Sequence, residues 1–339
     1  MEAFPSFAKS WDEINRQSSN HILLDSRFIA PLVRHFGSER TLLAVRGGSE
    51  APGMALIERG KPGFWQTFQP GQAPLGAIVL GRDHDDPGVA IRELIRDLPG
   101  YALGFSVTQQ DPDFTCFTNL NGSLPFETLD YIQTPRLTVG GSFEAYWKSR
   151  SKNLTHNLSR QRRRLKEQGA VLELVVDRCA DAVAGAIQEY GDLESSGWKG
   201  RQGSAVAADN VQGRFYREML EDFCSTGEAV IYRLRLNGQT VAADLCLERS
   251  ATLFILKTAY DESIQGLSLG MLLHREMFQR LFDEKNVHMV EFYGQLRDWH
   301  TKWTTEVRRM YHINFYRFLC VAYIRKAMPH RRRIQKFEM

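Results

Sequence analysis

Apolar residues gather in three short runs near the middle of the chain. Two of the runs, 230–236 and 240–247, are separated by Asn237-Gly238. Asn-Gly readily adopts the positive φ values of a two-residue turn, so this arrangement predicts an antiparallel β-hairpin. A third apolar run, 253–259, follows a few residues later. We therefore expect three consecutive strands in this region.

The apolar spacing changes from strand-like to helical after residue 260. The helical segment carries apolar side chains at Met271, Leu272, Leu273, Met277, Phe278, Leu281 and Phe282. The loop before it, 265–270, contains Gly266 and Gly270. A glycine-rich turn that opens a helix leaves backbone N–H groups at the positive end of the helix dipole, where they can bind a pyrophosphate. The plainer interpretation is a flexible connection between a strand and a helix.

A further strand is predicted at 287–294, and the aromatic turn 296–303 follows it. Here the chain resembles the GNAT-like acyltransferases of the FemAB and CelD (cellulose-biosynthesis) type. In that family a strand with an acidic residue and a glycine precedes a Tyr-Lys pair and a tryptophan. The matching residues in this chain are Glu291, Gly294, Trp299-His300 and Trp303, with Trp-His in place of Tyr-Lys.

The resemblance covers roughly residues 135–318. Its other matching segments are 135–137, 142–147, the basic helix 157–165, the loop 196–200 and Tyr260-Asp261. In the glycine-rich loop, Gln265 and Gly270 fit the GNAT pattern, whereas Ser268 stands where the middle glycine is expected. The resemblance implies an α+β fold of two GNAT-like lobes, each with a mixed, largely antiparallel sheet flanked by helices.

Residues 1–134 show an alternation of strand and helix patterns of their own. Helices are expected at 26–36 and 89–98, strands at 41–46, 54–58, 75–80 and 102–108, and a loop at 61–74. The resemblance implies that this region is a degenerate GNAT-like domain. We expect the domain boundary within Thr134–Gly141, an acyltransferase domain over 135–320 and a basic tail over 321–339.

The composition is that of a folded globular protein. The chain has 339 residues with 43% hydrophobic content, which is enough for two cores. Its five cysteines form no Cys-x-x-Cys pair, so neither a zinc site nor a disulfide framework is predicted. The first residues lack a secretion signal, and no stretch of about 18 apolar residues occurs. These features favour a cytoplasmic location.

Positive charge is concentrated in two segments although the net charge is only +3. Lysine and arginine crowd residues 148–166 and 325–336. They can be solvated helix faces, or they can attract the phosphates of a donor, an anionic lipid surface or RNA. The tail follows the apolar run 321–324, so a peripheral contact with an anionic inner membrane and a lipid acceptor is one hypothesis.

The family resemblance implies transfer of an acyl group, acetyl or longer, from acyl-CoA to an amine, without a metal. The acceptor would be an amino sugar, an envelope precursor or a lipid amine. An amine must lose a proton before it attacks, and a histidine titrates near neutrality, so His300 is the first candidate base, with Glu291 and Asp298 as rivals. Residues expected to bind the donor are Thr258, Tyr260, Gln265, Gly266, Ser268 and Gly270. Residues expected to bind the acceptor are Trp198, Asp244 and Trp299.

Each candidate also has a plain structural interpretation. His300 can be an aromatic-packed surface histidine, Glu291 a solvent-facing strand residue, Asp244 an exposed hairpin aspartate and Trp198 a core residue.

Three other functions are compatible with the sequence. FemAB relatives that build peptidoglycan cross-bridges use aminoacyl-tRNA as the donor, and the basic stretch 148–166 could meet its backbone, although it lacks interleaved aromatic residues for stacking on bases. A non-catalytic binding module with a decayed site is the second. The third is a serine hydrolase, because residues 266–270 match Gly-x-Ser-x-Gly. That elbow belongs on a parallel sheet, whereas a hairpin precedes it here.

Overall fold

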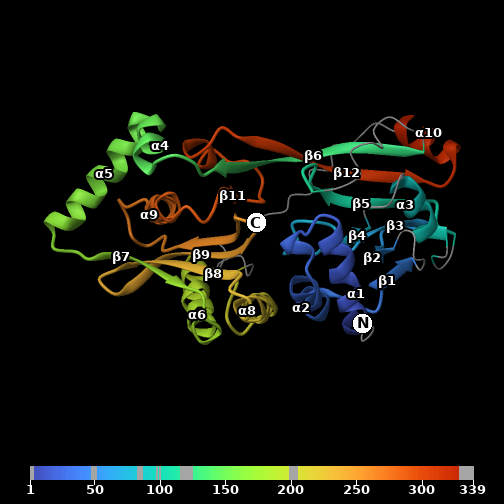
Figure 1. Ribbon diagram of the computed structural model, residues 1–339, viewed down its shortest axis with the longest axis horizontal. Coiled ribbons are helices and arrows are strands. Elements are labelled where there is room, and N and C mark those ends of the chain that lie inside the picture. The colour runs from blue at the N-terminus through green and yellow to red at the C-terminus, as the bar shows by residue number, and fades with distance from the viewer. Residues whose placement is uncertain are drawn as a thin grey trace. The chain divides into compact units, whose positions relative to one another are not determined.

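The computed structural model describes two compact units in one chain. The described residues are 4–46, 52–81, 87–96, 98, 101–114, 125–197 and 205–327. The first unit takes its residues from 1–133 and from 309 onward, and the second from 134–308. Both combine helices with a mixed sheet (Figure 1), so the predicted α+β class is confirmed.

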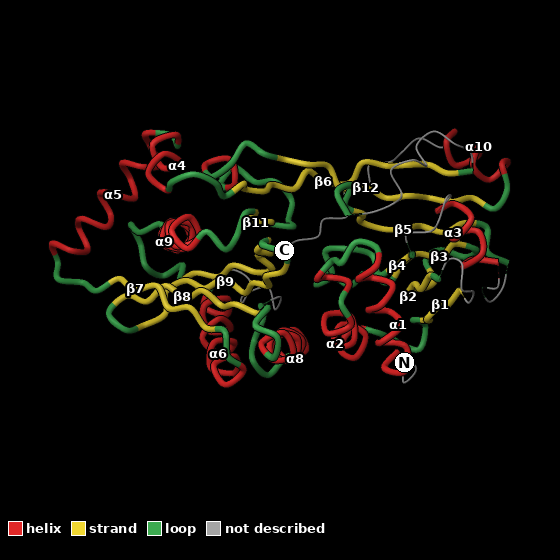
Figure 2. Tube along the Cα trace, viewed as in Figure 1, coloured by secondary structure: helices red, strands yellow, loops and turns green. Residues whose placement is uncertain are grey.

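The first unit begins with helices and continues into a sheet (Figure 2). Its elements are α1 (Phe4–Gln17), η1 (Ile22–Leu24), α2 (Ser26–Phe36), β1 (Leu42–Arg46), β2 (Gly53–Arg59), β3 (Phe64–Thr67), β4 (Ile78–Leu80), α3 (Pro87–Arg96), β5 (Gly104–Gln110), the first part of β6 (Phe126–Thr138), most of β12 (Val307–Tyr316) and α10 (Leu319–Ala327). The strand order is β1-β2-β3-β5-β12-β6, and β4 pairs with β2. Only β3 and β5 are parallel among the pairs whose register is described.

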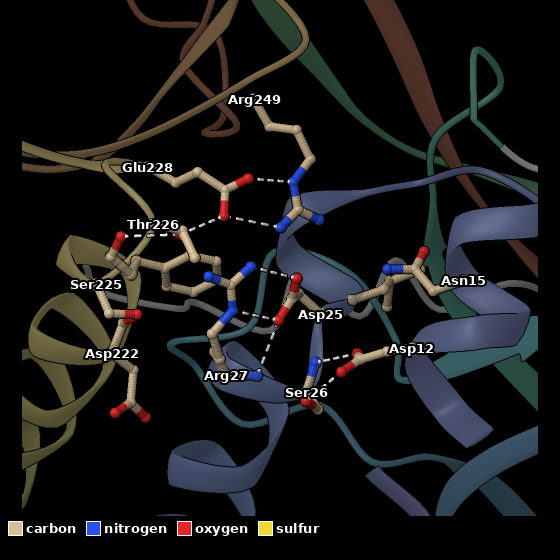
Figure 3. Close-up of polar contacts among 12 residues, drawn as sticks. Asp12, Asn15, Asp25, Ser26, Arg27, Asp222, Ser225, Thr226, Glu228 and Arg249 are labelled. Atoms are coloured by element: carbon tan, nitrogen blue, oxygen red, sulfur yellow. Dashed lines mark hydrogen bonds and ion pairs between the residues drawn. The ribbon is translucent and has the colours of Figure 1, made fainter. Parts of the chain in front are cut away.

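Helix α2 has the predicted bounds because its first turn is held by side chains. The carboxylate of Asp25 accepts the backbone N–H of Arg27 at 3.0 Å, which is the usual way to satisfy a free helix donor. The backbone N–H of Ser26 donates to Asp12 of α1 at 2.7 Å (Figure 3). Helix α1 was not predicted, yet it supplies this second support.

The core of the first unit lies between α3 and the sheet. Apolar side chains of α3 pack with Ile57, Trp65, Phe105 and Ile313 in one buried cluster. Trp65 belongs to β3, which forms inside the segment 61–74 that was predicted to be a loop. That prediction was wrong because Phe64–Thr67 pairs on both sides, antiparallel with β2 and parallel with β5.

Just after their last paired residues, the parallel strands β3 and β5 are held together by contacts among Thr67, Thr108 and Gly76. The hydroxyls of Thr67 and Thr108 are 2.6 Å apart, and the backbone N–H of Gly76 donates to the carbonyl of Thr108 at 3.1 Å. A Cβ atom at position 76 would collide with both threonines. Only glycine therefore fits where the chain closes this end of the strand pair.

The second unit contains the segments that carry the family resemblance. Its elements are the last part of β6, α4 (Phe143–Ser149), α5 (Lys152–Glu167), β7 (Leu172–Asp177), α6 (Ala180–Ser196), α8 (Val211–Cys224), β8 (Ala229–Leu236), β9 (Gln239–Arg249), β10 (Thr252–Tyr260), α9 (Leu269–Glu284), β11 (Met289–Glu291) and η3 (His300–Lys302). The strand order is β6-β11-β10-β9-β8-β7. Among the strand pairs described in this unit, only β10 and β11 are parallel.

The predicted hairpin between β8 and β9 is confirmed. Asn237 and Gly238 have φ values of 52° and 83°, as a two-residue turn requires. Helix α9 packs on one face of the sheet, and α6 and α8 pack on the other (Figures 1 and 2). The fully buried side chains of Leu272, Met277 and Phe278 anchor α9 in the core of this unit. The apolar spacing that predicted this helix is therefore its buried stripe.

Two strands run across the boundary between the units. Strand β6 enters the second unit, where Arg136–Thr138 pairs with β11, and β12 returns to the first unit, where it pairs with β5. Residues 309–320, expected in the acyltransferase domain, therefore group with the first unit. The basic tail beyond residue 327 lies outside the described residues.

Candidate active site

The parallel strands β10 and β11 part after three residue pairs. Thr252, Leu253 and Phe254 are paired with Met289, Val290 and Glu291, where β11 ends, whereas β10 continues to Tyr260. Beyond Phe254, the edge of β10 that faces β11 is therefore no longer paired with that strand.

The hydrogen bonds between β10 and β9 show which residues of β10 direct their backbone groups to the opposite edge. The N–H of Asp261 donates to Val241 of β9 at 2.9 Å. Because alternate residues of a strand direct their backbone groups to opposite neighbours, those of Thr258 and Tyr260 face away from β9. Both residues were predicted to bind the donor, and their N–H and C=O groups lie on the side that β11 leaves.

The loop from Asp261 to Ser268 carries the chain from β10 to the start of α9. Gly266 has a φ of 80°, which glycine adopts without strain, and it is exposed together with Gln265. Ser268 is the N-cap residue, but its side chain makes no capping hydrogen bond. The first N–H groups of α9 are therefore without a side-chain cap, at the positive end of the helix dipole.

A glutamine on α5 fixes the end of this loop. The amide of Gln161 accepts the backbone N–H of Ser268 at 2.9 Å and donates to its hydroxyl at 3.2 Å. On the same helix, Arg162 forms an ion pair with Glu276 of α9 at 3.0 Å. The predicted basic helix thus holds the glycine-rich loop, while Arg160 and Arg163 line an exposed hollow on its surface.

A buried polar cluster lies beneath the open edge of β10. The hydroxyl of Thr258 donates to Asp244 Oδ1 at 2.5 Å, and Nε2 of His274 lies 3.0 Å from Asp244 Oδ2. The second contact has the distance of an ion pair but not the angles of a hydrogen bond. Asp244 is fully buried and His274 is 2% exposed. The interpretation of Asp244 as an exposed hairpin aspartate was therefore wrong.

Aromatic rings enclose His274. Its imidazole stacks on Trp299 and Phe278 at centroid distances of 5.3 and 5.6 Å, and Phe292 and Trp303 approach it edge to face. Both of its ring nitrogens are buried without a hydrogen-bond partner among the described residues, as is Nε1 of Trp303.

Glu291 is held in a buried ion pair. Nη1 of Arg308 lies 2.7 and 2.5 Å from its two carboxylate oxygens. Glu291 is only 2% exposed, so the interpretation of a solvent-facing strand residue was wrong. Both oxygens of the carboxylate are therefore occupied by the guanidinium of Arg308.

His300 is a buried, neutral imidazole. Burial, assisted by the nearby His274, lowers its pKa to about 4. Its Nδ1 accepts the backbone N–H of Arg297 at 2.9 Å, so the neutral ring carries its proton on Nε2. Its ring stacks on Trp299 with centroids 3.6 Å apart. These features disfavour a base, and the role predicted for His300 stays a prediction.

The structure brings most of the predicted residues to one region of the second unit. Thr258, Tyr260 and the loop lie at the end of β10, while Trp299 covers the buried cluster. Asp298 is exposed on the aromatic turn, and its role also stays a prediction. Trp198 lies outside the described residues. The sequence interpretation gave His274 no role in acyl transfer, although a titratable residue within the apolar stripe of α9 was a signal for one.

Other chemistries find little support in this geometry. Ser268 is bonded to Gln161, and the strand before it is antiparallel to β9, which differs from a nucleophile elbow. No group of metal-binding side chains occurs among the described residues. Within the same residues, every helix is too short or too polar to cross a membrane.

Comparisons with known proteins agree with this geometry. Residues 152–301 match the family model of the acetyltransferase (GNAT) domain. No curated protein sequence matches the chain significantly.

Solved structures share the fold at low sequence identity. FemX is similar with a TM-score of 0.59 at 8% identity, covering 94% of this chain and 98% of its own. The C-terminal domain of a putative lysylphosphatidylglycerol synthetase from Agrobacterium fabrum has a TM-score of 0.57 at 15% identity, covering 95% of each chain. L-PGS from Bacillus licheniformis has a TM-score of 0.51 at 14% identity, covering 87% of this chain and 93% of its own.

Residues 152–301 match a GNAT domain and contain an uncapped helix after a strand that parts from its parallel neighbour, which together support an acyltransferase. The two-unit fold is shared with FemX over nearly the whole length of both chains. The resemblance to FemAB-like acyltransferases is thereby confirmed, at the level of fold.

Proposed function

We propose that this protein is an N-acyltransferase that moves an acyl group from acyl-CoA to an amine. The proposal rests on two neighbouring features, the uncapped N-terminus of α9 and the edge of β10 that extends beyond the end of β11. The pyrophosphate of CoA would accept hydrogen bonds from N–H groups at 269–271. The amide groups of its pantetheine arm would bind the backbone of Thr258 and Tyr260, as a further strand would.

The contacts of Ser268 add support for a bound anion. Its backbone N–H is already used by Gln161, which fixes the loop but leaves the next turn of the helix for a ligand. Tyr260 is 48% exposed and lies in van der Waals reach of a Cβ placed on Gly270. Glycine at this position lets a phosphate approach the helix closely.

The donor site can be tested by isothermal titration with acetyl-CoA, a long-chain acyl-CoA and free CoA. The variant is Ser268→Asp, which can cap α9 and still accept the bond from Gln161. It places a negative charge beside the expected pyrophosphate. At about 5 Å and an effective dielectric constant of about 20, that repulsion is about 3 kcal/mol, so affinity should fall at least about tenfold. Thermal stability should be unchanged or slightly higher.

Gln188→Glu is the matched control. Residue 188 is exposed on α6, on the other face of the sheet, and the substitution adds the same charge. It should leave the affinity for every CoA species unchanged. Equal affinity of Ser268→Asp and wild type would move the donor away from this helix. If the wild-type protein binds no CoA species, the acyl-CoA donor is refuted and an aminoacyl-tRNA donor becomes the better hypothesis.

The acceptor in this proposal is an amine of an envelope or lipid precursor. Leu319, Tyr323 and Ile324 of α10 are 52%, 60% and 56% exposed, and the basic tail follows them in the sequence. Such a helix can lie on an anionic membrane surface. Sedimentation with phosphatidylglycerol vesicles should recover the full chain but not a chain that ends at residue 318. Equal recovery of both would refute the membrane contact.

A further inference from the structure

The buried cluster under β10 contains polar atoms that its own fold does not satisfy. Asp244 Oδ2, both ring nitrogens of His274 and Nε1 of Trp303 lack a hydrogen-bond partner among the described residues. Buried polar atoms are nearly always paired, because each unpaired one costs free energy. Four such atoms, two of them on the imidazole of His274 and the others on Asp244 and Trp303, therefore call for a functional explanation.

Thr258 connects this cluster to the open edge of β10. Its hydroxyl proton is directed to Asp244 Oδ1 at 2.5 Å, so the lone pairs of the oxygen are left to accept from elsewhere. Thr258 is half-buried, whereas Asp244 and His274 are buried. A ligand on the edge of β10 would meet the hydroxyl first.

We propose that Thr258 takes a proton from the attacking amine and relays it to Asp244, and that His274 is the positioning residue that fixes Asp244. This inference rests on the proposed function. It makes Thr258 a catalytic residue in addition to its backbone contacts with the donor. Asp244 then acts on the amine through Thr258, not by direct contact.

The reaction balances with the groups present. The amine nitrogen bonds to the thioester carbonyl carbon, and the C–S bond breaks with its electron pair on sulfur. The excess proton on nitrogen moves to Thr258 Oγ1 as the original hydroxyl proton moves to Asp244 Oδ1. The same path returns one proton to the thiolate. The products are an amide and free CoA thiol, and the protein is restored.

The groups that face the cluster are uncharged near neutral pH. Burial raises the pKa of Tyr232 on β8, the register partner of Asp244, and that of Cys246 on β9, and burial lowers the pKa of His300 in η3. The ring contacts from α9, the aromatic turn and η3 are made by Phe278, Phe292, Trp299 and Trp303. No charge on these neighbouring groups therefore competes with the contact between Thr258 and Asp244.

The test compares Thr258→Val with Thr258→Ser. Valine keeps the shape and removes the hydroxyl, whereas serine keeps the hydroxyl. The assay measures release of CoA thiol from acetyl-CoA, with hydroxylamine as the amine probe. Thr258→Val should lower kcat about 100-fold, which is typical of a lost proton-transfer group, with KM for acetyl-CoA within about twofold. Thr258→Ser should stay within about fivefold of wild type.

Asp244→Asn supplies a second, independent readout. It should lower kcat and remove the acidic limb of the pH profile, because an amide cannot take up the proton. His274→Gln should lower kcat but keep that limb, as a positioning role requires. A pH profile of Asp244→Asn that matches wild type would overturn the relay.

The outcomes separate the relay from the donor site. Wild-type kcat in Thr258→Val, or acetyl-CoA binding without any transfer to hydroxylamine, would overturn the relay and leave the proposed donor intact. Absence of acetyl-CoA binding by wild type would instead overturn the proposed function, and the relay with it. Circular dichroism of each variant shows whether the fold is kept, and Thr258→Ser decides the question if Thr258→Val does not fold.

Discussion

Replacing Glu291 by glutamine tests whether this residue holds the fold or performs catalysis. Glutamine has nearly the same shape but no charge, so the guanidinium of Arg308 would be left buried without its carboxylate. The two side chains are 3% and 6% exposed, and one nitrogen of Arg308 contacts both carboxylate oxygens. Water can therefore do little to replace the lost partner.

Breaking a buried ion pair by removing one partner costs about 3–5 kcal/mol. For a unit of 150–250 residues, each kcal/mol lowers Tm by about 2–4 °C. We expect the unfolding transition of the second unit to fall by about 6–20 °C in Glu291→Gln, as measured by differential scanning calorimetry.

Glu306→Gln is the matched control on the same unit. Glu306 is 44% exposed and lies 4.0 Å from Arg136, so this pair is screened by solvent. Exposed ion pairs contribute less than about 1 kcal/mol, and Tm should fall by about 2 °C at most. The double variant Glu291→Leu with Arg308→Met should recover much of the loss, because an apolar pair leaves no charge buried.

The structural role of Glu291 is refuted if Glu291→Gln unfolds like the control. If that variant also loses acyl transfer at unchanged stability, Glu291 acts in catalysis as first predicted. A large loss of stability with wild-type turnover at low temperature would assign the residue to the fold alone.

Two further changes test other contacts. The folded pKa of His300, about 4, lies below the ordinary 6.5, so its contribution to stability, up to about 3 kcal/mol, is present above pH 6.5 and is lost as the pH falls toward 4. His300→Asn keeps an acceptor for the Arg297 N–H but removes the imidazole. Urea unfolding of this variant should therefore show a smaller loss of stability between pH 7 and pH 5 than the wild-type protein does. An equal loss in the two proteins would contradict the assignment. His312, also with a pKa of about 4, should keep its own share. Gly76→Ala should destabilise the first unit by about 1–3 kcal/mol through overpacking against Thr67 and Thr108. Gly71→Ala is the control, because nothing lies within 4 Å of the new Cβ, and it should change the free energy of unfolding by less than about 0.5 kcal/mol. Equal thermal shifts of the two variants would show that position 76 is not tightly packed.

The sequence predicted best those elements that local interactions determine. The hairpin at Asn237-Gly238 follows from turn chemistry, and α9 follows from its apolar stripe. The four-residue strand β3 was missed because it is stabilised by neighbours distant in the sequence. Strand β11 was expected over 287–294 but ends at Glu291, since only three of its residues pair with β10. Apolar spacing does not record where a neighbouring strand ends.

The site was predicted in part for the same reason. Its loop and the residues at the end of β10 are contiguous in sequence, so a motif can indicate them. The cluster of Asp244, Thr258 and His274 comes from two strands and a helix, and its three residues are separated by 14 or more positions. Their meeting depends on the register of β9 against β10, where Asp244 and Thr258 are direct partners. No pattern along the chain expresses that register.

The return of β12 to the first unit has a consequence for the order of folding. This strand lies between β5 and β6 in the sheet of the first unit, yet it is synthesised after the whole of the second unit. On the ribosome the inserted unit can complete its own core while the first unit still exposes the edge of β5. The part of the chain that is made first therefore becomes fully native last, and a nascent chain that stops before β12 would present an open strand edge to any partner, including a chaperone.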